Sequence, residues 1–132
     1  MKSLADKIIS FLLSIILFLF GDIDFLLKAI IAIMFLDYIT GLCKAFVLKK
    51  VNSSIGAKGI IKKAVYLCII AISVLLDQLL GTKSGLRTLI ITTFIFNEIL
   101  SILENSSEMG IKIPNVLYQS LEKLHKDDIN EK

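Results

Sequence analysis

The chain has 132 residues, of which 55% are hydrophobic and 20% are charged, and its mean hydropathy is +0.79. Such a composition is unusual for a soluble domain and typical of a small membrane protein. The net charge of +3 is too small to indicate a nucleic-acid partner. Both cysteines, Cys43 and Cys68, lie inside apolar segments, which excludes a secreted disulfide scaffold.

The apolar residues are gathered in long runs that do not alternate with polar ones. Because lipid allows only helices or closed barrels to span, such runs predict an all-α integral membrane protein. We expect a transmembrane domain over residues 1–105 with four helices, at about 4–20, 25–48, 64–80 and 86–103. The first run is short for a span, so the alternative is three spans with the first segment lying in the membrane interface.

Asp37 lies near the midpoint of the second run. A carboxylate at that depth costs roughly 3 kcal/mol, so such a side chain usually faces a protein interior or a watery cavity. On a helix, Asp37, Thr40, Gly41 and Lys44 recur at spacings that place them on one stripe. This stripe predicts assembly with other helices around polar groups.

The connection after the second run is the most basic part of the chain. Positive charge in short loops marks the cytoplasmic side. We therefore expect a cytoplasmic loop, a cytoplasmic C-terminus and, if the first segment spans, a cytoplasmic N-terminus. The loop's basic residues are Lys49, Lys50, Lys58, Lys62 and Lys63.

Further polar side chains interrupt the third and fourth runs. Two interpretations stay open for the whole set: bonding between helices, with Asp37 paired to Lys44 or to a neighbouring subunit, or lining of an aqueous path. The candidates beyond the second helix are Ser73 and Asp77 on the third, and Thr93, Asn97, Glu98 and Ser101 on the fourth.

Residues 106–132 predict a cytoplasmic tail with one short amphipathic helix, at about 114–125. Pro114 suits a first helical turn, and leucines follow at spacings of four and three. Such a helix rests on the membrane surface or on its own neighbours, or it serves as a docking site for a partner.

Signals of catalysis are absent from the sequence. His125 is isolated in the tail, neither GxSxG nor HExxH occurs, and Gly56 and Gly59 lack the context of a phosphate-binding loop. We expect no enzyme activity, no catalytic residue, no cofactor and no metal site.

Four motifs in order resemble one family. They are DYITGLCKAF from Asp37, NSSIGAKGIIKK from Asn52, LLDQLLG from Leu75 and FNEILSILENSSEMGIKIP from Phe96. Together they resemble the phage-lysis and toxin-secretion holins of Gram-positive bacteria, which include the holin-like proteins encoded beside large clostridial toxins. The family's motif positions correspond here to Asp37, Gly41, Asn52, Ser53, Gly56, Gly59, Asp77, Asn97, Glu98, Ser101, Glu104 and Asn105.

The resemblance implies a protein that works in the bacterial cytoplasmic membrane with the bilayer and its own copies as partners. It implies a homo-oligomer that forms a pore or lesion, through which an endolysin or a toxin without a signal peptide leaves the cell. A competing interpretation from the residues alone is a small ion channel or transporter subunit that conducts ions without releasing protein.

Overall fold

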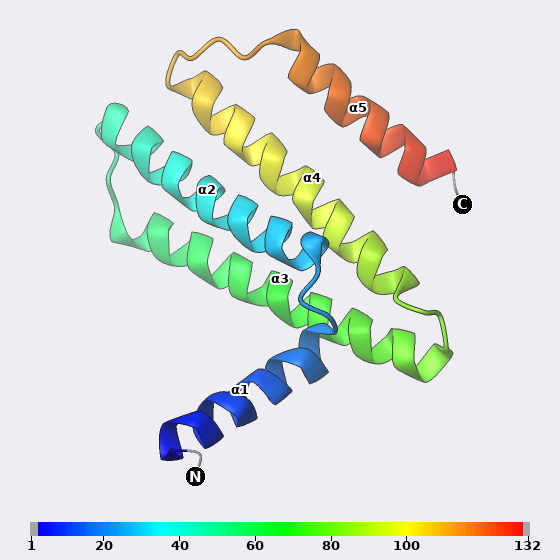
Figure 1. Ribbon diagram of the computed structural model, residues 1–132. Coiled ribbons are helices and arrows are strands. Elements are labelled where there is room, and N and C mark those ends of the chain that lie inside the picture. The colour runs from blue at the N-terminus through cyan, green and yellow to red at the C-terminus, as the bar shows by residue number, and fades with distance from the viewer. Residues whose placement is uncertain (1–2, 131–132) are drawn as a thin grey trace.

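The computed structural model describes residues 3–130, so Met1, Lys2 and the last two residues of the predicted tail lie outside the described residues (Figure 1). The described part is all-helical and contains no strand, which confirms the predicted all-α class. Its helices are α1 (Leu4–Phe20), α2 (Phe25–Val47), α3 (Ser53–Leu80), α4 (Gly85–Glu108) and α5 (Asn115–Asn130).

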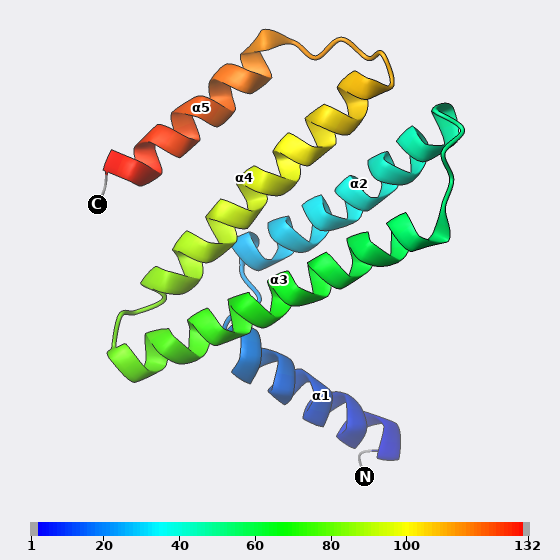
Figure 2. The same ribbon diagram turned by 180° about the vertical axis from the view of Figure 1, so that it is seen from behind.

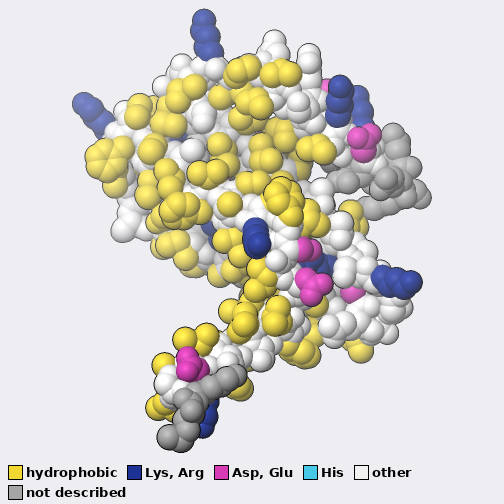
Figure 3. Space-filling model, viewed as in Figure 1, with side chains coloured by type: hydrophobic (Ala, Val, Ile, Leu, Met, Phe, Trp, Pro, Cys, Tyr) yellow, Lys and Arg dark blue, Asp and Glu magenta, His cyan; other side chains and the backbone are white. Residues whose placement is uncertain are grey.

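Helices α2, α3 and α4 form a bundle around a small apolar core, and all three are long and apolar enough to cross a membrane. The core consists of Leu27, Ile30 and Met34 on α2 with Ile70 on α3 and Ile91 on α4. Tyr66 and Phe94 pack against this core and stack on each other, with their ring centroids 3.9 Å apart. Elsewhere the bundle presents a broad hydrophobic surface (Figure 3), which suits a lipid environment.

Helix α1 leaves the bundle and contacts mainly α3 near its own C-terminal end (Figures 1 and 2). It begins with a capping box, in which Ser3 and Asp6 bond each other's backbone N–H groups, and it ends at Gly21 with φ of 72°. With 17 residues it is shorter than the three candidate spans, and none of its side chains is buried.

Helix α3 begins earlier than predicted, inside the segment that was expected to form a long basic loop. Asn52 caps this helix through a bond from the Ser54 N–H to its Oδ1 at 3.0 Å, so the helix begins at Ser53 and not near residue 64. Lys58, Lys62 and Lys63 are therefore helical residues, and only Lys49 and Lys50 remain in the connection.

The last two helices are also longer than expected. Helix α4 continues to Glu108 because its final turns pack on α2, where Leu103 and Asn105 are buried. Helix α5 doubles back beside α4 (Figures 1 and 2) and places Leu121 against its neighbours, whereas Leu117 and Leu124 stay exposed.

Candidate functional site

A cluster of charged side chains joins the three long helices. Lys63 on α3 donates hydrogen bonds from its Nζ to Asp37 Oδ2 on α2, at 2.7 Å, and to Glu98 Oε2 on α4. The side chains of Lys63 and Asp37 are 14% and 13% exposed, and Glu98 is fully buried. We call these three residues the charge cluster. It is the point at which α2, α3 and α4 are held together by charge.

The cluster contains two carboxylates for one ammonium group. Glu98 Oε1 is buried with no hydrogen-bond donor among the described residues, and the Nζ of Lys62 lies 3.9 Å from it. Lys62 is about half exposed and also lies over the Tyr66 ring, 5.3 Å from its centroid. Buried charges require pairing, so Lys63 is the essential cation and Lys62 a peripheral one.

An amide extends the cluster toward the end of the bundle where α4 ends. Asn105 donates from Nδ2 to Asp37 Oδ1 at 3.3 Å and to Thr40 Oγ1 at 3.2 Å. Thr40 in turn donates from Oγ1 to the Asp37 carbonyl at 3.0 Å. Asp37 is therefore held on both carboxylate oxygens, by α3 on one side and by α4 on the other.

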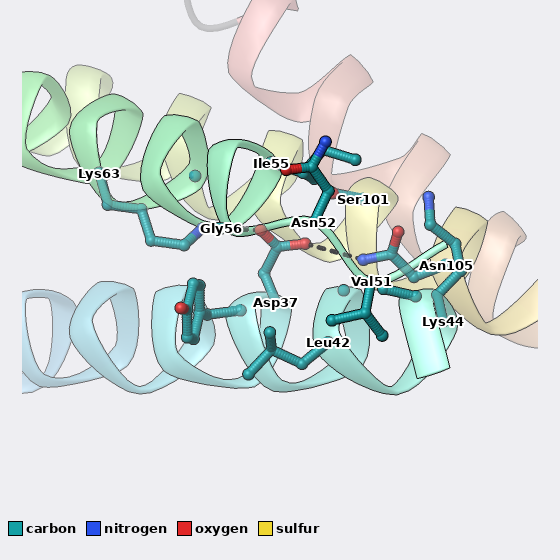
Figure 4. Close-up of a pocket in the computed structure, with 14 residues that line it drawn as sticks. Asp37, Leu42, Lys44, Val51, Asn52, Ile55, Gly56, Lys63, Ser101 and Asn105 are labelled. Atoms are coloured by element: carbon teal, nitrogen blue, oxygen red, sulfur yellow. Dashed lines mark hydrogen bonds and ion pairs between the residues drawn. The ribbon is translucent and has the colours of Figure 1, made fainter. Parts of the chain in front are cut away.

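A groove runs between α2 and α3, and Ser101 and Asn105 of α4 contribute to the lining of its first part (Figure 4). One part has a volume of about 190 Å³ and includes Gly41, Gly56 and Gly59 in its lining. A second part of about 340 Å³ is lined by side chains of α2 and α3 only. Tyr38 and Lys63 line both parts, and we call the two parts together the α2–α3 groove.

At the other end of the bundle, Arg87 clamps the turn between α1 and α2. Its Nη1 and Nη2 donate to Asp24 Oδ2 and Oδ1 at 2.8 and 3.0 Å, a two-pronged contact. Its Nε donates to the Phe20 carbonyl at 2.8 Å, and Nη2 also donates to the Asp22 carbonyl at 2.9 Å. The hydrogen bond from Arg87 lowers the pKa of Asp24 to about 2, well below the ordinary range of a carboxyl group.

Asp77, on the last turn of α3, caps the start of α4. It accepts bonds from the Leu86 and Arg87 N–H groups at 2.9 and 2.8 Å and from the Thr82 hydroxyl. The residue before α4, Ser84, makes no side-chain capping bond, so Asp77 satisfies the free N–H groups of this helix in its place. Helix capping therefore accounts for the burial of the Asp77 carboxylate.

The predicted polar set thus divides between several places. Asp37, Thr40 and Glu98 meet at the charge cluster, while Gly41 and Ser101 line the adjoining groove. Lys44, a suggested partner of Asp37, instead pairs with Glu108 at 3.3 Å. The residues that lie elsewhere are Ser73, bonded to the Ile70 carbonyl, Asp77 at the α4 cap, and the exposed Thr93 and Asn97.

The sequence predicts the wrong role for one residue of the site and misses another. Lys63 is predicted as part of the cytoplasmic basic loop, whereas it provides the cation of the cluster, and Arg87 is not among the predicted site residues. Arg87 is the only arginine in the sequence and follows a turn that lies at the same end as the acidic residues 22 and 24. A single arginine at the end of the bundle that carries these acids is a sequence signal for an ion pair. Within residues 3–130, no group of His, Cys, Asp and Glu is placed to hold a metal ion.

One family model matches most of the chain, and several known proteins are similar to it over a comparable length. Residues 14–126 match the bacteriophage holin family. An uncharacterized Listeria monocytogenes protein is 41% identical over 76% of this chain and 71% of its own length. An uncharacterized 14.9 kDa Clostridium perfringens protein from the nagH 3′ region is 41% identical over 81% of this chain and 82% of its own.

The probable holin of Bacillus phage phi105 is 28% identical over 84% of this chain and 82% of its own. No solved structure matches the chain significantly. The match covers α2, α3 and α4 completely, and it therefore includes the charge cluster, the α2–α3 groove and the Arg87 clamp. The chain belongs to the bacteriophage holin family.

Proposed function

We propose that the protein is a holin that assembles with its own copies in the bacterial cytoplasmic membrane and opens a pore or lesion. Through this opening an endolysin, which lyses the cell, or a toxin without a signal peptide leaves the cytoplasm. The family match supports the holin role, and so does the similarity to the probable holin of Bacillus phage phi105. The observation that carries the mechanism is the charge cluster, which connects three helices of membrane-spanning length.

The proposed topology follows from the distribution of lysines. The end that carries Lys49 and Lys50 lies in the cytoplasm, together with α5, and the Arg87 clamp lies at the outer surface. Helix α1 then crosses as a fourth span with a cytoplasmic N-terminus. Its length is about 25 Å at the α-helical rise, slightly less than the hydrocarbon thickness. Local thinning of the bilayer accommodates such a difference at small cost.

In the closed state, Lys63 pairs with both carboxylates of the charge cluster inside one chain. Opening requires these groups to face water, because a charged group cannot be turned toward lipid at low cost. Assembly of several chains provides such a water-lined space when the α2–α3 side of each bundle turns to a common centre. The strength of the cluster then sets the barrier to opening.

Substitution at Asp37 tests this mechanism. Asp37→Asn removes a negative charge but keeps the size of the side chain, so membrane insertion is retained and the Lys63 contact is weakened. We expect a changed onset of lysis in cells that co-express an endolysin, measured from culture turbidity against the amount of protein in the membrane. Glu122→Gln, at an exposed carboxylate of α5, is the matched control. An unchanged onset for Asp37→Asn at equal membrane levels would contradict the role of the cluster.

A further inference from the structure

Asn97 presents its amide to the surroundings at the middle of a helix of membrane-spanning length. It stands at the midpoint of α4 and directly precedes Glu98, so it lies at the depth of the charge cluster. Its side chain is exposed with α5 in place beside α4, and it makes no hydrogen bond within residues 3–130. Because lipid offers an amide no hydrogen bond, this side chain requires protein or water as its partner.

The threonines that precede Asn97 on α4 do not have this need. Thr92 Oγ1 donates to the Thr88 carbonyl at 2.7 Å, and Thr93 Oγ1 donates to the Leu89 carbonyl at 2.8 Å. A hydroxyl group can thus be satisfied by a carbonyl one turn earlier in its own helix. The amide of Asn97 has two N–H donors and a carbonyl acceptor, and all of them remain to be satisfied from outside the chain.

Asn97 lies within a stripe of exposed and half-buried side chains that follows one side of α4. The members recur at spacings of four, four and three residues, which places them on the same side of the helix. We call them the Asn97 face; they are Leu89, Thr93, Asn97 and Leu100. The two leucines lie beyond Asn97 on either side, so a polar group stands at the centre of a surface that is otherwise suited to helix packing.

We propose that the Asn97 face pairs with the same face of a second copy of this chain. The inference rests on the self-assembly proposed above. A primary amide is complementary to itself, so Nδ2 of each Asn97 donates to Oδ1 of the other. Two copies inserted in the same direction are related by a two-fold axis along the membrane normal, and this axis brings the two amides together at one depth. A second copy therefore supplies both the donor and the acceptor that Asn97 lacks.

A carboxylate on the same side of α4 determines how the two helices approach. Glu104 is exposed and lies two turns after Asn97, about 10 Å nearer the cytoplasmic end. Its charge would repel the Glu104 of the second copy if the helices ran side by side along their whole length. The helices therefore cross at Asn97 and diverge toward both ends, as packed membrane helices commonly do.

The Asn97 face and the α2–α3 groove are different surfaces of the bundle. None of the four residues of this face lines either part of the groove. Pairing through α4 therefore leaves both grooves uncovered and able to turn toward water, as the proposed opening requires. A two-fold contact closes on itself, so it yields a dimer and does not extend into a filament. The dimer is then the unit from which a larger assembly is built.

Disulfide crosslinking at a single position tests the pairing, because a two-fold contact brings a residue near the axis close to its own copy. Cys43→Ser and Cys68→Ser first remove the native thiols, both of which are exposed. Thr93→Cys then places one thiol a turn from Asn97, and mild oxidation of the membranes should give a dimer band. The control is Ile72→Cys, which is 55% exposed and lies as far from the outer end of α3 as Thr93 lies from the outer end of α4. It should remain monomeric.

Substitution of Asn97 provides a second readout, by energy transfer between fluorescently labelled chains in phospholipid vesicles at increasing protein-to-lipid ratios. Asn97→Leu keeps a side chain of similar size and should weaken self-association by roughly tenfold, because two hydrogen bonds between membrane helices are lost. Asn97→Gln keeps the amide and should retain most of the association. Unchanged association of Asn97→Leu would overturn the proposal. Equal crosslinking of Thr93→Cys and Ile72→Cys, or none, would also overturn it.

Two further measurements separate this inference from the other roles open to the Asn97 face. Reaction of Thr93→Cys with a membrane-impermeant maleimide before any reporter release would refute the pairing, because the face would then lie against water. Release of a cytoplasmic enzyme without the Thr93 crosslink would refute the α4 contact and leave the holin role intact. The crosslink without release would support the contact and refute the holin role.

Discussion

Replacement of Lys63 by methionine tests the charge cluster most severely. The substitution keeps a long side chain but removes the cation that bonds Asp37 and Glu98. Two carboxylates then remain inside the bundle, one of them fully buried. Loss of one partner of a buried ion pair costs about 3–5 kcal/mol, because the other charge is left uncompensated. Because about 1.4 kcal/mol corresponds to a tenfold change in an equilibrium constant, this loss raises the unfolding equilibrium constant by about a hundredfold or more.

The neighbouring lysine provides a matched control. Lys62 lies 3.9 Å from Glu98 Oε1 and its side chain is 54% exposed, so Lys62→Met should cost no more than about 1 kcal/mol. Unfolding of both variants by a denaturing detergent in mixed micelles gives the two free energies. Addition of Glu98→Gln to Lys63→Met should recover part of the loss. Equal destabilisation by Lys62→Met and Lys63→Met would refute the assignment of Lys63 as the essential cation.

Three further predictions concern the rest of the bundle. Asp77→Ala removes the N-terminal cap of α4 and should lower the free energy of unfolding by about 1–2 kcal/mol, whereas Asp77→Asn should cost less, as measured in the same micelles. Asn105→Leu leaves Asp37 Oδ1 without its donor and should cost about 1–3 kcal/mol; a neutral result would contradict the observed bond. The pKa of Asp24 is lowered to about 2, so its contact with Arg87 stabilises the fold above the ordinary carboxyl pKa near 3.9, and this contribution is lost as the pH falls through about 2. A pH titration of unfolding for the native chain and Arg87→Met should show a difference that is constant above about pH 4 and shrinks below it.

The sequence was sufficient to predict the helical class and the anomaly at Asp37. Long apolar runs have few alternatives in a membrane, and a carboxyl group in the middle of one stands out by its desolvation cost alone. Glu98 was found by the same argument. These residues lie where composition and local energetics are decisive.

The partners of these residues could not be predicted in the same way. Lys63 was read as part of a cytoplasmic loop because its basic neighbours dominate that segment, while the cap at Asn52 that starts the helix earlier is a single side-chain bond. The distance between Lys63 and Glu98 along the chain is large, and only packing of α3 against α4 brings them together. Asp77 likewise looked like a membrane carboxylate, because its role as the α4 cap depends on the turn that follows α3.

The most direct test of the central claim is the simultaneous measurement of membrane potential and release of a cytoplasmic reporter enzyme after induction of this chain in bacteria. A holin that opens a protein-sized lesion should release the enzyme at the moment when the potential falls, with no endolysin present. A fall in potential while the enzyme stays inside would contradict the claim and indicate an ion channel, and a chain that causes neither effect would contradict pore formation altogether.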